Sequence, residues 1–77
     1  MLKMNISYNG LWKLLIDKKI HQADFRREIG IAPSTLTKLR RDEMVSMDVL
    51  MRACAFLDCK VGDIVDFIKV EEAGEPE

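Results

Sequence analysis

Apolar residues near the start of the chain recur at the spacing of one helical face. Within residues 8–18, Leu11, Leu14 and Leu15 occupy positions i, i+3 and i+4. Side chains at that spacing lie on one side of an α-helix, because the helix has about 3.6 residues per turn. The pattern predicts a first helix over 8–18, with Asn9 as its N-cap.

Two further helices are predicted on either side of a glycine. The second spans 22–29, and Gly30 follows it where a helix commonly stops in the left-handed conformation. The third spans 33–41, since Pro33 suits a first helical position, where its missing N–H leaves no bond unmade. The apolar residues expected to lock these two helices together are Phe25, Ile29, Ile31, Leu36 and Leu39.

The second half of the chain predicts two more helices and a pair of short strands. Ser46 is placed to cap a fourth helix, whose apolar stripe is expected to consist of Met47, Leu50, Ala53, Cys54 and Leu57. A fifth helix is predicted from about 61 to 66, with Val61, Ile64 and Val65 in the core. The alternating segments 4–8 and 66–70 could pair as a β-ribbon that joins the termini. The expected fold is therefore all-α, a compact five-helix bundle with this short ribbon.

Length and composition limit what else the chain can be. Its 77 residues, 48% hydrophobic and 32% charged, fit one globular domain, assigned to 1–70, and the acidic segment 71–77 is expected to be a disordered tail. Without a signal peptide or an apolar run that could span a membrane, we expect a cytoplasmic protein. Cys54 and Cys59, far from the single His21, are interpreted as structural rather than metal-binding. We expect no cofactor and no enzyme activity, because the chain lacks a glycine-rich phosphate loop and room for a substrate pocket.

Charge is divided between the two halves of the chain. The formal net charge is −1, yet residues 1–41 hold nine Lys or Arg and three Asp or Glu, a net +6, whereas residues 42–77 hold three and ten, a net −7. A basic half can contact a phosphate backbone, where the release of counterions drives binding. The division favours a nucleic-acid partner, although solvated helix surfaces that happen to segregate would give the same pattern.

The second and third helices match the pattern of a DNA-reading motif. Two short helices joined by a tight glycine turn, the second exposing small polar and basic side chains, form a helix-turn-helix. A major groove about 12 Å wide admits a helix only if its outer face is slim. Ser34, Thr35 and Thr37 meet that condition, and Lys38 is long enough to reach O6 and N7 of a guanine.

At these positions the chain resembles the phage-repressor-like (Cro/cI, XRE family) helix-turn-helix transcriptional regulators. The residues that carry the resemblance are Gln22-Ala23-Asp24-Phe25, Gly30 to Leu39, Val45-Ser46, Val49-Leu50 and Ala55 to Asp58. The resemblance covers roughly residues 8–67. It implies the lambda-repressor-like DNA-binding fold, binding of double-stranded operator DNA, and regulation of transcription, as a repressor.

The resemblance also implies roles for single residues. Gln22 corresponds to a glutamine that bonds a phosphate and braces a recognition residue. The first residues of the third helix correspond to positions that face bases or phosphates, Lys38 to a further groove-facing position, and Arg41 to one at the backbone edge. The residues expected to bind DNA are Gln22, Pro33, Ser34, Thr35, Thr37, Lys38 and Arg41, with Lys18, Lys19, Arg26 and Arg40 as candidates for further phosphate contacts.

Three places depart from the family pattern. Arg26 stands where the family often has a small residue, so its side chain must point outward or displace packing. Ala32 replaces the usual Ser or Thr cap of the third helix and weakens that cap. Asp42 and Glu43 bring acidic groups close to the expected DNA surface.

Several apolar residues in the second half indicate a protein partner. Val49, Phe56, Phe67 and Ile68 give more apolar surface than one small domain needs to expose. We interpret them as a homodimer interface, since helix-turn-helix proteins read half-sites about one helical turn apart. The alternative is that they are used inside the core. The alternative function is an antitoxin-like subunit that neutralises a partner protein through this surface and the acidic half.

Overall fold

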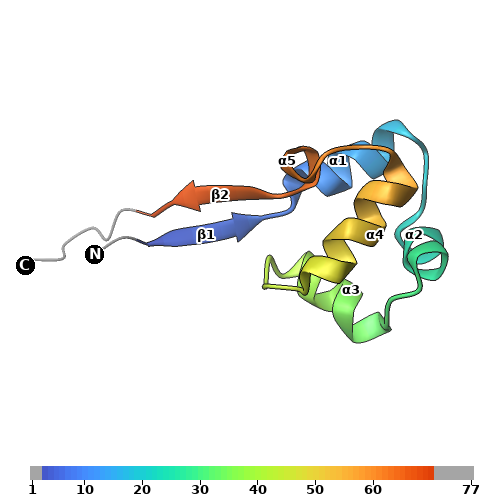
Figure 1. Ribbon diagram of the computed structural model, residues 1–77, viewed down its shortest axis with the longest axis horizontal. Coiled ribbons are helices and arrows are strands. Elements are labelled where there is room, and N and C mark those ends of the chain that lie inside the picture. The colour runs from blue at the N-terminus through green and yellow to red at the C-terminus, as the bar shows by residue number, and fades with distance from the viewer. Residues whose placement is uncertain (1–2, 71–77) are drawn as a thin grey trace, which may run out of the picture.

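Five helices and a two-stranded ribbon make up the part of the chain that the computed structural model describes, residues 3–70. The helices gather at one end and the ribbon projects from them (Figure 1). This arrangement confirms the predicted five-helix fold with a ribbon, while the predicted acidic tail, 71–77, lies outside the described residues. In chain order the elements are β1 (Met4–Ser7), α1 (Asn9–Asp17), α2 (Gln22–Ile29), α3 (Pro33–Arg40), α4 (Met47–Leu57), α5 (Val61–Ile64) and β2 (Asp66–Lys69).

The ribbon pairs the first strand with the last. β1 and β2 run antiparallel, with Met4 opposite Lys69 and Ile6 opposite Phe67. Residues that oppose each other share a face of the sheet, and neighbours along a strand alternate between faces. Met4, Ile6 and Phe67 therefore lie on one face of the ribbon and Ile68 on the other.

One hydrophobic core joins all five helices. The predicted core residues of the first three helices are confirmed, apart from Leu14, which is only half-buried. Phe25 is completely enclosed, and Tyr8, which precedes α1, is buried as well. The buried set consists of Tyr8, Leu11, Leu15, Phe25, Ile29, Ile31, Leu36, Leu39, Ala53, Leu57 and Ile64.

The structure corrects two predicted core positions and one predicted cap. Met47 is 68% exposed and Val61 is 50% exposed, because each is the first residue of its helix and turns outward. Asn9, the predicted N-cap of the first helix, is instead the first residue of α1. The N-cap is Tyr8, and the Tyr8 side chain makes no capping hydrogen bond. Ser46 does cap α4 as predicted, since its Oγ accepts a hydrogen bond from the Val49 N–H.

The fifth helix is shorter than predicted. It ends at Ile64, because Val65 adopts an extended backbone (φ −125°, ψ 138°) and leads directly into β2. Its other end is fixed by Asp63, whose carboxylate accepts a hydrogen bond from the Lys60 N–H at 3.0 Å. The helix also packs closely on α1, because a Cβ added at Gly10 would lie 2.2 Å from the carbonyl oxygen of Asp63.

The described helices are all short. Within residues 3–70, none combines the length and the hydrophobicity needed to span a bilayer.

Candidate nucleic-acid interface

The turn between α2 and α3 has the geometry that its sequence predicts. Gly30 adopts the left-handed conformation (φ 70°, ψ 39°), and its N–H donates to the carbonyl oxygen of Arg26 at 3.0 Å. A residue with a Cβ is strained in that conformation, whereas glycine adopts it freely. Pro33 is the first residue of α3, and Ala32 before it provides no side-chain cap. The turn therefore sets the angle between α2 and α3 without help from a capping side chain.

Two arginines donate hydrogen bonds to backbone oxygens of this turn. Nη1 of Arg52, in α4, donates to the carbonyl oxygens of Ile29 (3.2 Å) and Gly30 (3.3 Å). Nη1 of Arg26 donates to the carbonyl oxygen of Ile31 at 3.1 Å. The half-buried Arg26 thus folds back on the turn, which explains how it replaces the small residue of the family. Sequence reasoning missed Arg52, because its acceptors are backbone atoms that no residue pattern marks.

The outer face of α3 carries the predicted DNA-binding side chains. Leu36 and Leu39 are buried beneath it. Thr35 and Thr37 are half-buried at its margins, and the Thr37 hydroxyl donates to the carbonyl oxygen of Pro33 at 3.1 Å. The exposed residues of this face are Pro33, Ser34, Lys38, Arg40 and Arg41. Small groups at the start of α3 and cations toward its end are therefore open to solvent together.

A side-chain hydrogen bond connects α3 back to the start of α2. Nε of Arg40 donates to Oε1 of Gln22 at 2.8 Å. Gln22 is half-buried and Arg40 is exposed, so the bond lies on the surface that the two helices share. Gln22 thereby holds the Arg40 guanidinium in place. The family resemblance implies a bracing role of this kind for Gln22.

The two acidic residues after α3, Asp42 and Glu43, both bond Tyr8, Asp42 through its carboxylate and Glu43 through its backbone. Asp42 has a left-handed backbone (φ 58°), and its Oδ1 accepts a hydrogen bond from the Tyr8 N–H at 3.1 Å. The Tyr8 hydroxyl donates to the carbonyl oxygen of Glu43 at 2.7 Å. Burial raises the pKa of Tyr8, and the nearby Asp42 carboxylate raises it further. Asp42 therefore accepts a hydrogen bond from the residue that precedes α1.

Comparison with known proteins identifies the type of domain. Residues 10–69 match the family model of the Cro/C1-type helix-turn-helix DNA-binding domain. The chain belongs to this family. A solved structure titled "Crystal structure of transcriptional regulator VanUg, Form II" is similar over 87% of this chain and 89% of that one, with 42% sequence identity and a TM-score of 0.84. A search of curated protein sequences found no match.

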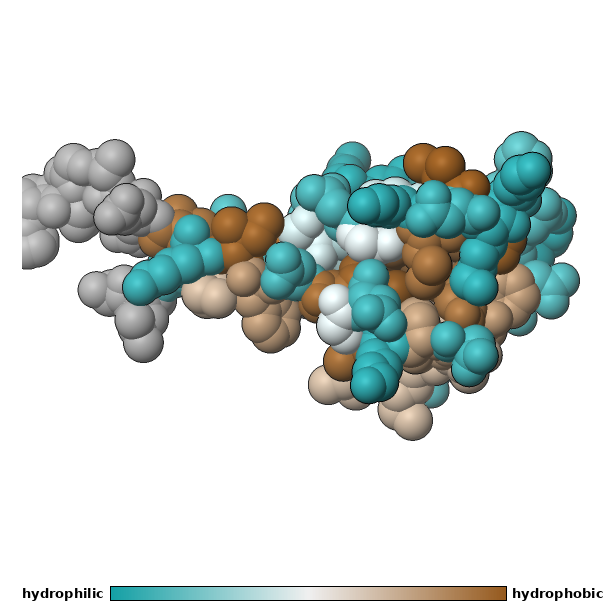
Figure 2. Space-filling model, turned by 90° about the horizontal axis from the view of Figure 1, so that it is seen from above, coloured by the Kyte–Doolittle hydropathy of each residue, from teal (hydrophilic) through white to brown (hydrophobic). Residues whose placement is uncertain are grey.

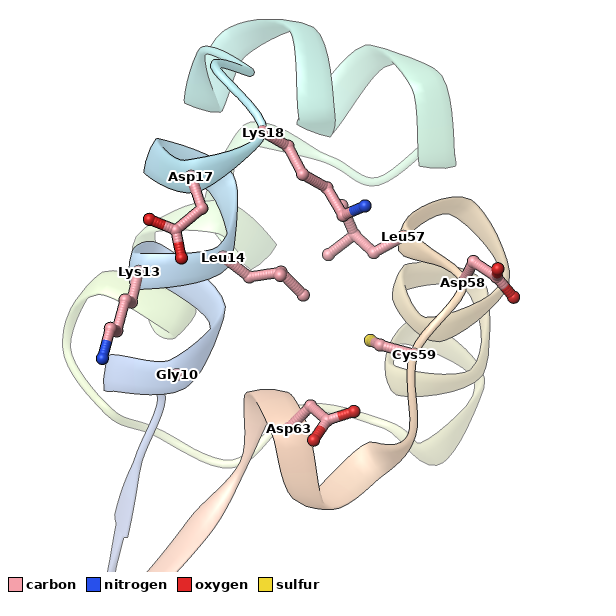
Figure 3. Close-up of a pocket in the computed structure, with 9 residues that line it drawn as sticks. All are labelled: Gly10, Lys13, Leu14, Asp17, Lys18, Leu57, Asp58, Cys59 and Asp63. Carbon is pink, nitrogen blue, oxygen red and sulfur yellow. The ribbon is translucent and has the colours of Figure 1, made fainter.

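One of the predicted phosphate contacts, Lys18, lies over a separate pocket of this Cro/C1-type domain. Lys18, at the end of α1, extends toward Leu57 over a pocket of about 380 Å3 (Figure 3). No residue of α2 or α3 lines that pocket. Lys19 is exposed in the link between α1 and α2, with φ 59°. The same pocket contains Cys59, and burial together with the neighbouring Cys54 raises the pKa of Cys59 to about 11.

The four residues predicted for a dimer interface do not form one surface in this domain. Val49 is half-buried against the core, and the Phe56 ring packs on Phe25 with 6.3 Å between centroids. Phe67 and Ile68 are both exposed, but they lie on opposite faces of the ribbon. Only Phe67 adjoins the other exposed apolar residues of α4 and α5.

Proposed function

We propose that this Cro/C1-type domain regulates transcription as a repressor, by placing α3 in the major groove of operator DNA. The observation that carries the proposal is the outer face of α3. It presents Ser34, Lys38 and Arg41 to solvent over two buried leucines, in a chain of a DNA-binding family. The similar structure titled as a transcriptional regulator supports the regulatory role.

In this proposal the length and charge of each α3 side chain decide whether it contacts bases or phosphates. Pro33, Ser34 and Thr35 begin the helix and face bases or the adjacent phosphates, since short side chains let the helix enter the groove. Thr37 adds a further DNA contact at the margin of the same face. Lys38 reaches a base edge, where a bond to O6 and N7 of guanine discriminates between sequences.

Side chains around this face contact the phosphate backbone. Arg41 lies at its end, and Arg40 is held by Gln22 at 2.8 Å, so both can neutralise phosphates, Arg40 without further ordering. Contacts of this kind fix the register of the protein on the duplex but carry no sequence information. We leave Lys18 and Arg26 out of the proposed surface, because one covers a separate pocket and the other bonds the turn.

The protein is proposed to act in the cytoplasm as a homodimer that occupies two half-sites. Reading helices of a dimer must be spaced by about one helical turn of DNA, roughly 34 Å. Two symmetric copies of α3 would then read a palindromic operator. Repression follows if the bound dimer blocks other proteins from the same DNA.

Selection of bound duplexes from a random pool at near-physiological salt tests this function. We expect an enriched palindrome with half-sites one helical turn apart. The same selection with a Lys38→Ala, Arg41→Ala double variant should show weaker enrichment and lose the preference at one base pair of each half-site. Failure of the unaltered protein to enrich any sequence would refute the proposal.

The matched control for the double variant removes the same charge from another surface. Lys13 and Lys60 are exposed and belong to neither α2 nor α3. A Lys13→Ala, Lys60→Ala variant should enrich the same palindrome as the unaltered protein. If both double variants lose enrichment equally, binding depends on total charge and not on the face of α3.

A further inference from the structure

The two cysteines of the chain meet at the end of α4. Asp58 has a left-handed backbone there (φ 53°, ψ 57°), and the N–H of Cys59 donates to the carbonyl oxygen of Cys54 at 3.1 Å. A helix that ends in this way commonly brings the side chains of these two positions into contact. Both thiols are free, and the chain has no other cysteine. Within the chain, each thiol can therefore bond only with the other.

The two thiols also lie close enough to act on each other. Burial, and then the Cys54 thiol through its charge and a hydrogen bond, raise the pKa of Cys59 to about 11. Asp63 adds to this rise, and Lys18 opposes it. A disulfide joins residues whose Cα atoms are about 4.4–6.8 Å apart, and the backbone hydrogen bond between Cys54 and Cys59 holds the two residues together. The end of α4 thus places two thiols where they can bond without unwinding the helix.

Both thiols are half-buried, but each lines a hollow at the surface. Cys54 lines an apolar groove of about 630 Å3 along α4, α5 and the start of β2. In Figure 2, apolar side chains appear both on the ribbon and along the adjoining side of the helical body. Cys59 lines the pocket of about 380 Å3 beside Lys18, and its sulfur points into that pocket (Figure 3). A small polar reagent can reach Cys59 from this side, because Lys18 and Asp63 also line the pocket.

We propose that Cys54 and Cys59 form a redox site, in which the two thiols close to an intramolecular disulfide when a small-molecule disulfide oxidises them. Oxidised glutathione is an oxidant of this class. The inference goes beyond the proposed function and does not depend on it. It assigns a reaction to two residues whose sequence pattern indicated only a structural role.

The oxidation is an exchange of disulfides in two steps. Cys59 loses its proton to water, and its thiolate attacks one sulfur of the oxidant, whose S–S bond breaks and releases one half as a thiolate. Cys54 then loses its proton, attacks the Cys59 sulfur and displaces the second half. In total the two protein thiols lose two electrons and the oxidant gains them. The two released thiolates take up the two protons.

The disulfide would fix the end of α4. It closes a loop that contains only residues 55–58, where the chain turns from α4 toward α5. A crosslink of this kind restricts the unfolded chain and so favours the folded one. No residue of α2 or α3 lines either hollow. We therefore expect the oxidised domain to be more stable, with α3 unchanged.

Incubation of the folded, reduced protein with oxidised glutathione at several pH values tests the site. The chain should lose two hydrogens by mass spectrometry, and both thiols should disappear from a thiol titration. Because the thiolate is the attacking form, the rate should rise about tenfold for each pH unit below the Cys59 pKa of about 11. Tm should rise by a few degrees on oxidation, since so short a loop gains little from closure, and dithiothreitol should restore it.

Two variants serve as controls. Cys54→Ala removes the second step and leaves the first, so this variant should stop at a mixed disulfide and carry one glutathione on Cys59. A Cys54→Ala, Cys59→Ala double variant should keep its mass and its Tm in the oxidant. That result would exclude an effect of the reagent on other groups of the protein.

Three results would overturn the inference. One is a folded chain that keeps both thiols while the urea-unfolded chain forms the disulfide in the same oxidant, because the cysteine contact would then serve packing alone. Another is a product with glutathione on both cysteines, or with two chains linked by a disulfide. The third is a lower Tm for the oxidised protein, which would mean that the folded end of α4 does not accommodate the bond.

Discussion

Arg40 of α3 donates a hydrogen bond from Nε to Oε1 of Gln22, the first residue of α2, across 2.8 Å. Only Nε is used in this bond, so the two terminal nitrogens of the guanidinium can still face a phosphate. Gln22 thus orders a long cationic side chain before any DNA arrives. The contact joins residues 18 positions apart, and it depends on the angle that the glycine turn imposes.

Replacing Gln22 by Ala is expected to weaken DNA binding by about 1 kcal/mol, because Arg40 must then be immobilised during binding. Exposed ion pairs and hydrogen bonds contribute little to the stability of the folded state, so the free energy of unfolding should hardly change. A double-mutant cycle with Arg40→Ala, measured by fluorescence anisotropy on labelled duplex, should give a coupling of at least about 0.5 kcal/mol.

The control cycle for this coupling pairs Arg40 with Arg27. Arg27 is exposed on the same helix as Gln22 but contacts Asp24. Arg27→Ala and Arg40→Ala should therefore be additive. Additivity of the Gln22 and Arg40 changes themselves would show that the bracing contact plays no part in binding.

Lys38 should contribute to sequence-specific DNA affinity, and Arg41 to affinity for DNA of any sequence. Lys38→Ala is expected to cost about 1–3 kcal/mol on the selected operator and to relax specificity at one base pair. Arg41→Ala should weaken all sequences alike and reduce the slope of log K against log salt by about 1. Titrations at several salt concentrations, on operator and on scrambled duplex, measure both effects. Identical profiles for the two variants would contradict this division of roles.

The helix-turn-helix was predictable from sequence because its signals are local. Gly30 permits the left-handed conformation and Pro33 favours a helix start, so the bounds of α2 and the start of α3 follow from residues within the motif. Positions 25 and 29 then define the buried side of α2. The contacts that hold the motif in place are different in kind. Arg52 bonds Gly30 across 22 positions and Tyr8 bonds Glu43 across 35, and no short-range pattern contains these pairs.

The exposed apolar surface was only partly predictable. The helical spacing of apolar residues places Met47 and Val61 on the core-facing side of their helices. It does not show which residues of that side lie over the centre of the core. Both occupy the first position of a helix, at the edge of the core, and they line an apolar groove along α4, α5 and the start of β2 instead. Phe56 carries the opposite lesson. It stands outside the predicted stripe and is 39% exposed, yet its ring packs at the edge of the core on Phe25.

Replacing Gly10 even by alanine should destabilise the protein. A Cβ there would lie 2.2 Å from the backbone oxygen of Asp63, so α1 and α5 would have to separate. Overpacking of this kind costs about 1–3 kcal/mol, which for a domain of this size lowers Tm by roughly 4 °C or more. Gly62→Ala is the control, because nothing lies within 4 Å of a Cβ at that position, and it should leave Tm unchanged or raise it. Equal Tm values for the two variants would contradict the close packing of α1 on α5.

Tyr8 should make the protein less stable in alkaline solution. Its pKa is raised above the ordinary value of about 10 by burial and then by the Asp42 carboxylate. The unfolded chain therefore loses the phenolic proton at a lower pH than the folded one does. The contribution of this group to stability is complete below pH 10, and it decreases as the pH rises through the folded-state pKa.

The comparison that isolates this effect is Tyr8→Phe, measured by urea unfolding with the fluorescence of the single Trp12 as the signal. Below pH 10 the variant should be less stable by about 0.5–1.5 kcal/mol, because the Glu43 carbonyl loses its hydrogen bond. Above pH 10 the difference should shrink, since only the unaltered protein has the phenol to titrate. Cys59, whose pKa is raised to about 11, lowers stability over an overlapping range, so both proteins should carry Cys59→Ala. A difference that stays constant from neutral to alkaline pH would mean that the Tyr8 hydroxyl titrates alike in the folded and unfolded chains.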